Sequence, residues 1–357
     1  MIIGVCGFCS SGSSAVSDYL SEFEENQVLD MCEFTIPYLP DGLEDLKHHV
    51  VDSITRDESG YIAIERFKRF MHDNYAKGAL AKLSNLTDKE IDKITDEFMN
   101  EITQLEWITT TRSDKLLHPS WFYRYFVLSI LKQRIISRLN VRFKIGLPLY
   151  PNHPVQVSIN PDNFMDESRK FVSRILEGMG ADFTKNIVLD QPFIGDDPAK
   201  SFCFFENPKA IVVDRDPRDI YLFGKTVLYK RGRLMPTDNV QDYVNYFKLI
   251  RENRPYKMDN PNILIIRFED LVYNYDATTL KIRSFCGLPE NKRKFSIFDP
   301  AVSMPNTQVF RKFPEYQQDI KYIEQELHDY LFDFSSYPEP PSEGQMFFGK
   351  SPLNRKK

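Results

Sequence analysis

The sequence predicts an α/β fold in which helices flank a parallel sheet. Two observations carry this prediction. Apolar runs that do not alternate recur along the chain, and such runs are typical of parallel strands buried on both faces. Helical patterns separate these runs, as expected when each strand is followed by a crossover helix. At 357 residues and 42% hydrophobic content, the chain is long enough for one large α/β domain with a substantial core.

The first apolar run lies at 2–8. A loop of small residues from Cys9 through Ser10 to Ser14 follows it, and a helix is predicted at about 13–24. A loop of small residues before a helix turns backbone N–H groups toward an anion such as phosphate. Gly7 and Gly12 nearly fit the nucleotide P-loop spacing, but Ser13 stands where the lysine belongs. The alternative to phosphate binding is a strand-to-helix turn that uses small residues for tight packing. We interpret Cys9 as a small loop residue of this kind and not as a nucleophile.

The remaining elements follow in order. A second buried strand is predicted at about 27–34, and Glu33 ends it at the edge where open parallel sheets place their ligands. Further strands are predicted at 186–190, 209–214 and 263–268, and further helices at 164–179, from 220, at 277–285 and at 317–331.

A long insert separates the second and third strands. It is predicted to be helical over about 43–139, with a capping box at Thr87 and Glu90 and another helix starting near Trp121. We expect a single α/β domain over 1–337 with a helical insert at about 43–160 that covers the sheet edge. The tail at 338–357 is expected to have no fixed structure of its own.

The insert is basic although the chain carries a net charge of −5. A solvated helix face would explain this, and so would a basic wall that faces an anionic ligand or a membrane surface. Between residues 115 and 161 there are seven basic and no acidic side chains, namely Lys115, Arg124, Lys132, Arg134, Arg138, Arg142 and Lys144.

Composition excludes several classes of protein. The net negative charge argues against a generic nucleic-acid binder. No apolar run approaches the roughly 20 residues of a membrane span, and no cationic leader precedes the first strand. The five cysteines are odd in number and lack metal-ligand spacing, so we expect reduced thiols, no metal and a cytoplasmic protein.

Four segments resemble the sulfotransferases that use 3′-phosphoadenosine-5′-phosphosulfate (PAPS). The sequence VDRDPRDI at 213–220 resembles the 3′-phosphate signature of this family, and 11–14 resembles its 5′-phosphosulfate loop. The segments 266–271 and 285–289 are similar to a third family segment, and 306–312 to its C-terminal basic segment. The match covers about 2–34 and 187–331, and it is to bacterial members that resemble the carbohydrate sulfotransferase branches.

The resemblance implies PAPS as the cofactor. PAPS carries phosphate at two ends, and its 5′ end would be held by the loop residues Ser10, Ser11, Gly12, Ser13 and Ser14. Arg215 would bind the 3′-phosphate through two parallel hydrogen bonds from its guanidinium. The alternative is that it forms an ion pair with the neighbouring acids. Arg311 and Lys312 would reach the cofactor from the C-terminal segment.

Two positions depart from the family pattern. Ser10 stands where the family usually has a cation, and Phe223 stands where it has a serine that binds the 3′-phosphate. Lys144 or Lys225 is expected to replace the missing cation. Lys225 or Thr226 could take over the role of the serine.

The implied reaction is transfer of the sulfuryl group from PAPS to an acceptor hydroxyl. A carbohydrate is the expected acceptor, and a lipid or steroid hydroxyl is the alternative. Glu33 matches the general base of the carbohydrate branches, and His118 and His153 are alternatives. Aromatic side chains of the insert, such as Trp107, would suit a sugar face. A nucleotide-dependent kinase, which would want the P-loop lysine, and a non-catalytic PAPS- or nucleotide-binding protein are the competing readings.

Overall fold

A computed structural model describes residues 1–29, 32–53, 57–109, 111, 117, 135–144, 153–228, 234–252 and 260–340. The chain divides into two compact units. The sheet unit comprises 1–35 and 181–357, and the insert unit comprises 36–180.

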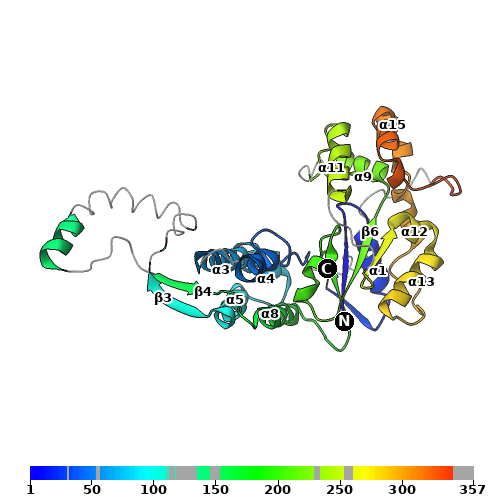
Figure 1. The fold of residues 1–357 in the computed structure, drawn as a ribbon. Coiled ribbons are helices and arrows are strands. Elements are labelled where there is room, and N and C mark those ends of the chain that lie inside the picture. Colours follow the sequence, from blue (N-terminus) through cyan, green and yellow to red (C-terminus); the bar gives the residue numbers. More distant parts are fainter. Residues whose placement is uncertain are drawn as a thin grey trace. The chain divides into compact units, whose positions relative to one another are not determined.

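The sheet unit is built on five parallel strands in the order β2-β5-β1-β6-β7 (Figure 1). Val5 in the central strand pairs with Asp190 on one side and Ile211 on the other. The parallel sheet flanked by helices confirms the predicted fold class. Its strands are β1 (Ile2–Gly7), β2 (Asn26–Leu29), β5 (Asn186–Asp190), β6 (Pro208–Asp214) and β7 (Ile263–Arg267).

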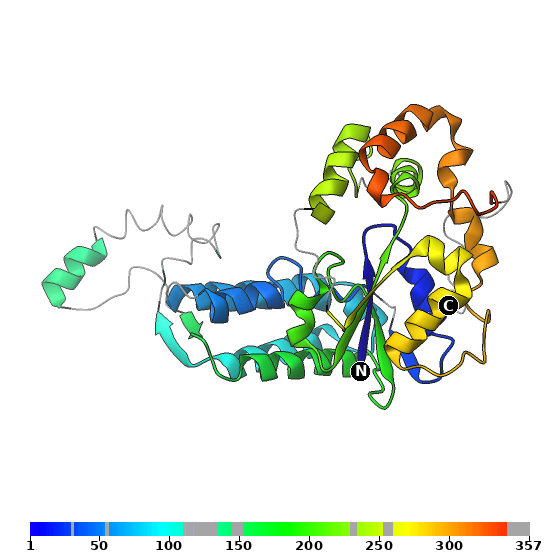
Figure 2. The same ribbon diagram turned by 45° about the vertical axis from the view of Figure 1, so that its right-hand side comes forward.

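Three helices cover one face of the sheet (Figure 2): α1 (Ser13–Leu20), α12 (Phe268–Tyr273) and α13 (Tyr275–Cys286). Their apolar side chains form one buried cluster with strand residues such as Val5 and Val213. On the other face the Phe193 ring lies against β1. A Cβ at Gly4 would lie 2.3 Å from that ring, so this close approach requires a glycine.

A second apolar cluster gathers helices that follow the carboxyl ends of β6 and β7. It joins Tyr221 and Phe223 to Tyr243 and Phe247, and it includes Val309. The elements of this part are η3 (Pro198–Phe204), α9 (Pro217–Phe223), η4 (Gly224–Leu228), α11 (Val240–Glu252), α14 (Pro300–Ser303), η5 (Met304–Asn306), η6 (Val309–Lys312), η7 (Pro314–Tyr316), α15 (Gln317–Glu326) and η8 (His328–Tyr330).

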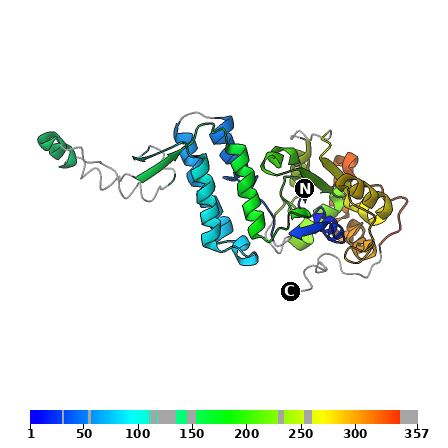
Figure 3. The same cartoon turned by 90° about the horizontal axis from the view of Figure 1, so that it is seen from below.

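The insert unit is largely helical (Figure 3). The rings of Phe67, Phe98 and Phe171 join its three long helices: Phe98 stacks on Phe171, and Phe67 meets both edge to face. Thr87 and Glu90 form the predicted capping box. Its described elements are α2 (Leu43–Lys47), η1 (His48–Asp52), α3 (Asp57–Met71), η2 (His72–Ala76), α4 (Ala79–Leu83), α5 (Asp88–Ile102), β3 (Leu105–Thr109), β4 (His153–Val157) and α8 (Phe164–Gly178).

Two predicted elements were wrong. The second strand ends at Leu29, and Glu33 lies four residues beyond it. Leu29 pairs with Leu189, and the last residue of β5 is contacted outside any strand, by Phe34 N donating to Asp190 O at 2.8 Å. Residues 105–109 form a strand instead of a helix, because they pair with 153–157 far along the chain.

Other predictions lie beyond what the structure describes. The helix expected near Trp121 and the end of the tail at 341–357 are outside the described residues. Among the helices that are described, none has the length and apolar character needed to cross a bilayer.

Candidate functional site

The loop between β1 and α1 has the backbone of a tight turn. Ser11 N donates to Phe8 O at 2.9 Å, and both Ser10 (φ +66°) and Gly12 (φ +92°) adopt left-handed conformations. A Cβ at Gly12 would lie 2.6 Å from the Phe268 ring, so a side chain is excluded there. Ser13 opens α1, and its Oγ accepts a hydrogen bond from Gln191 Nε2 at 3.0 Å. The loop therefore presents small polar residues at a helix N-terminus.

Arg215 follows β6 and touches this loop directly. Its Nη1 donates to Ser10 O at 3.1 Å, and its Nη2 donates to Asn306 O. The side chain is only 5% exposed, and its guanidinium lies 5.2 Å from the centre of the Phe268 ring. Its Nε has no hydrogen-bond partner in the described part of the chain. Three of the four motif segments thus meet at one arginine.

Buried acids surround this arginine. Asp216 caps α9 by accepting from Arg218 N, and Arg218 forks onto both oxygens of Asp216 at 2.9 and 2.8 Å. Arg218 is therefore the main ion-pair partner of Asp216, while Arg215 lies 4.0 Å from Asp219. The acid cluster leaves Arg215 more weakly paired than Arg218.

Burial raises the pKa of two of these acids. It raises the pKa of Asp219 to about 7, against the opposing charge of Arg215. It raises the pKa of Glu269 to about 8, helped by the negative charge of Asp216. Glu269 Oε1 accepts a hydrogen bond from Asp216 N at 2.9 Å, so the carboxyl group also joins the end of β6 to α12.

The other predicted cofactor residues lie in different surroundings. Lys225 Nζ donates to Thr237 O at 2.8 Å, and also to Asp238 O and Tyr221 OH. Arg311 is 43% exposed and pairs with Glu339 at 2.8 Å. Lys312 donates to Pro305 O at 3.3 Å; burial lowers its pKa while the charge of Asp219 opposes this shift. Of these three cations, Lys312 is the one that the structure links electrostatically to the Arg215 cluster.

The predicted bases are distributed across both units. Glu33 is exposed, and its charge adds to burial in raising the pKa of Cys9 in the loop. His153 belongs to the insert unit, where its Nε2 lies 2.9 Å from Tyr61 OH. His118 lies outside the described residues, and Lys144 belongs to the insert unit. Glu33 is therefore the predicted base that the structure links to the loop.

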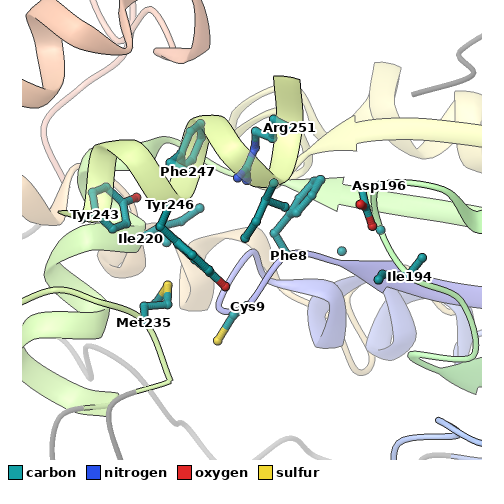
Figure 4. Close-up of a pocket in the computed structure, with 13 residues that line it drawn as sticks. Phe8, Cys9, Ile194, Asp196, Ile220, Met235, Tyr243, Tyr246, Phe247 and Arg251 are labelled. Atoms are coloured by element: carbon teal, nitrogen blue, oxygen red, sulfur yellow. The ribbon is translucent and has the colours of Figure 1, made fainter. Parts of the chain in front are cut away.

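Sequence reasoning missed a second arginine at the loop. Arg251 on α11 forks onto Asp214, the last residue of β6, at 2.7 and 3.3 Å. The rings of Phe8 and Phe247 lie 3.8 and 3.6 Å from its guanidinium carbon (Figure 4). A cavity of about 320 Å³ opens beside this stack. The spacing of Tyr243, Phe247 and Ile250 on one helical stripe was the available signal.

No protein-family model matches the chain, and no curated protein matches it. Among solved structures, it is similar to the "Sulfotransferase Domain from the Curacin Biosynthetic Pathway", with 15% identity, a TM-score of 0.34 and coverage of 81% of this chain and 74% of that chain. It is also similar to the "Sulfotransferase Domain from the Synechococcus PCC 7002 Olefin Synthase", with 12% identity, a TM-score of 0.35 and coverage of 81% and 73%. At such low scores the likeness carries no functional argument, so the function must be argued from the chain's own residues.

Proposed function

We propose that this protein transfers a sulfuryl group from PAPS to a hydroxyl group of an acceptor. The observation that carries the proposal is the hydrogen bond from Arg215 Nη1 to Ser10 O. It joins two segments that are 205 residues apart, each of which resembles one anion-binding motif of the same family. A cofactor with phosphate at two ends needs two anion holders at a fixed separation.

The chemistry of Arg215 suits one of these ends. A guanidinium can bind phosphate with two parallel hydrogen bonds, and charge-assisted bonds of this kind are stronger than neutral ones. Arg215 Nε has no described partner, and Nη2 now donates to a backbone carbonyl that a phosphate would replace. Lys312 would add a second positive charge to the 3′-phosphate, with Arg311 beside it at the edge of the site.

The loop suits the other end. Ser11, Gly12, Ser13 and Ser14 would offer backbone N–H groups and hydroxyls to the 5′-phosphosulfate at the N-terminus of α1. Ser11 Oγ is buried and has no partner in the described part of the chain. Lys225, proposed as the cation that replaces the family residue at Ser10, would have to leave its present carbonyl partners to reach the phosphate.

The transfer itself would be an in-line displacement. The sulfur–oxygen bond to the 5′-phosphate breaks, a bond forms from sulfur to the acceptor oxygen, and 3′-phosphoadenosine-5′-phosphate (PAP) leaves. The Glu33 carboxylate would take the proton of the acceptor hydroxyl. By analogy with phosphoryl transfer, positioning and charge stabilisation would supply most of the rate enhancement.

Further parts of the proposal rest on sequence alone. A carbohydrate acceptor is what the family branch that the motifs resemble implies, whereas a cytoplasmic enzyme without a metal follows from the number and spacing of the cysteines. Contact of the basic insert with a membrane surface depends on residues that lie mostly outside the described ranges, so it also stays a prediction.

Nucleotide binding tests the proposal first. Thermal unfolding is measured with PAP, ADP and ATP at equal concentrations. We expect PAP to raise the midpoint most, since ligands that bind the folded state stabilise it by mass action. A larger shift with ATP and magnesium would favour a kinase. If PAP binds but no sulfuryl group is transferred to any hydroxyl acceptor tested, the non-catalytic binder is the better description.

A further inference from the structure

Three buried side chains around the end of β6 each hold a polar atom that has no hydrogen-bond partner in the described part of the chain. These atoms are Arg215 Nε, Asp219 Oδ2 and Glu269 Oε2. Arg215 is 5% exposed, and the two acids are not exposed at all. Buried polar groups are nearly always paired, so three unpaired atoms in one cluster need an explanation.

The two acids reach this cluster from different helices. Asp219 Oδ2 lies 4.0 Å from Arg215 Nη2, and Oδ1 of the same carboxyl group accepts from Phe310 N at 3.2 Å. Glu269 Oε1 accepts from Asp216 N at 2.9 Å. Each acid therefore has one oxygen fixed by a backbone N–H group and one oxygen without a described partner.

The charges of the cluster do not balance when every acid is ionised. Arg218 forks onto Asp216, which makes these two side chains an ion pair of their own. The single positive charge of Arg215 then faces the carboxyl groups of both Asp219 and Glu269. An unpaired buried charge is costly, and a carboxyl group avoids this cost by holding a proton.

The other charged and titratable side chains around the cluster already have partners. Two acids form ion pairs with arginines, and a tyrosine hydroxyl and a lysine ammonium group donate to backbone carbonyls. The lysine is half-buried, so water screens much of its charge. These groups are the pairs Asp214–Arg251 and Glu324–Arg218, together with Tyr243 and Lys312.

We propose that binding of the 3′-phosphate of PAP at Arg215 is coupled to the uptake of a proton by Asp219 or Glu269. The inference rests on the proposed function, because it takes this phosphate as the bound anion. The phosphate adds negative charge beside two buried carboxyl groups, which disfavours their ionised forms. The proton comes from solvent and joins a carboxylate oxygen, and no other bond forms or breaks.

This coupling gives PAP affinity a defined pH dependence. Burial raises the pKa of Asp219 to about 7 and that of Glu269 to about 8, and the phosphate would raise both further. Affinity is then highest where both acids already hold protons, and it falls as the pH rises above about 7. Each proton taken up corresponds to a tenfold loss of affinity per pH unit.

Calorimetric titration of the full chain in two buffers of different ionisation enthalpy counts these protons. At about pH 8 the nucleotide's own phosphates, with a second pKa near 6, are ionised and contribute almost none. We expect the wild type to take up roughly one proton per PAP bound, and far less with AMP, which lacks the 3′-phosphate. No uptake with PAP, or equal uptake with AMP, would overturn the proposal.

An isosteric variant distinguishes this role from a merely structural one. Asp219→Asn keeps the shape of the side chain and cannot ionise. At about pH 8.5 it should bind PAP about fivefold or more tightly than the wild type, because no carboxylate competes for Arg215. A merely structural role predicts weaker binding, and that result would contradict the proposal. Asp182→Asn, at an exposed aspartate of the sheet unit, should change neither affinity nor proton uptake.

A second variant keeps the test usable if Asp219→Asn does not fold. Glu269→Gln should also reduce proton uptake and strengthen PAP binding at about pH 8.5, and unchanged uptake in this variant would count against the acid pair. The two proposals fail in different ways. If the wild type binds PAP without taking up a proton, the coupling falls and sulfuryl transfer stands. If the wild type does not bind PAP at all, the proposed function falls and the coupling falls with it.

Discussion

The two sides of the loop after β1 each hold a buried arginine, and the two arginines differ in their partners. On the β6 and β7 side, Arg215 is buried among Asp216, Asp219 and Glu269, and its Nε has no described partner. On the cavity side, Arg251 is similarly buried, but its Nε and Nη2 both donate to the carboxylate of Asp214, and two aromatic rings lie against its guanidinium. The donors of Arg215 bind neutral carbonyl oxygens, which a phosphate could replace, whereas those of Arg251 bind a carboxylate.

This difference shows that a buried arginine at a sheet edge is not by itself an anion site. What matters is which acceptors its donors already bind. An arginine forked onto a carboxylate contributes mainly packing and orientation, because a second anion would have to displace the first. The contrast predicts that PAP binding depends on Arg215 and not on Arg251.

The largest expected effect is on the rate of sulfuryl transfer. Glu33→Gln keeps the shape of the side chain and removes its basicity. Turnover should fall by roughly 10²- to 10⁴-fold, the usual share of general-base catalysis, with PAP affinity nearly unchanged. Glu24→Gln, at another exposed glutamate of the sheet unit, is the control. If Glu33→Gln retains turnover while His118→Ala or His153→Ala abolishes it, the base lies in the insert.

The next effect concerns the loop itself. Gly12→Val places a side chain against the Phe268 ring at a left-handed position. PAP affinity should fall at least about 100-fold, because two or more charge-assisted hydrogen bonds of about 1.5 kcal/mol each are lost together. Calorimetric titration measures the change. Gly287→Val is the control, since Gly287 also has positive φ but would meet nothing within 4 Å. A folded Gly12→Val variant with wild-type PAP affinity would exclude the loop as the site.

The smallest effect is on stability. The folded state raises the pKa of Glu269 from 4.5 to about 8 and that of Asp219 from 3.8 to about 7. Between these limits the folded state holds more protons than the unfolded state, so the free energy of unfolding falls as pH rises. Each kcal/mol lost lowers the melting temperature by about 2–4 °C.

The variant Glu269→Gln isolates one carboxyl group in this pH dependence. Its melting temperature should fall less steeply than that of the wild type between about pH 4.5 and pH 8, because the amide does not titrate. Calorimetric scans across this range provide the comparison. Parallel slopes for the two proteins would show that Glu269 is ionised throughout, contrary to its buried surroundings.

The sequence predicted the charged side of the loop better than the apolar side. The strands at 186–190 and 209–214 were readable because continuous apolar runs bounded by polar residues specify buried strands locally. Arg215 could be predicted because its motif is contiguous in the sequence. The cavity could not be predicted, because it is assembled from separate segments whose proximity depends on the order of the strands. Likewise, pairing between β3 and β4, 44 or more residues apart in sequence, overrode the local helical pattern of the insert.

The same reasoning explains the misplaced end of the second strand. Residues 27–34 have the composition of a strand, but a strand needs a partner along its whole length. The described ladder of β2 ends with Leu29 opposite Leu189, and Asp190 O accepts a hydrogen bond from Phe34 N instead of from a continuing strand. Only the tertiary pairing reveals this limit, and it leaves Glu33 on an exposed segment near Cys9 instead of at a strand end.

Comparison of PAP with AMP tests the central claim most directly, because the two nucleotides differ only in the 3′-phosphate. Calorimetric titration of the wild type should give PAP an affinity about 30-fold higher or more, corresponding to about 2 kcal/mol for a charged hydrogen-bond partner. In Arg215→Ala the ratio of the two affinities should fall close to one, with AMP affinity largely retained. Arg169→Ala, at a half-buried arginine of the insert unit, should preserve the ratio. Equal affinities of PAP and AMP in the wild type, or an unchanged ratio in Arg215→Ala, would contradict a 3′-phosphate site at Arg215.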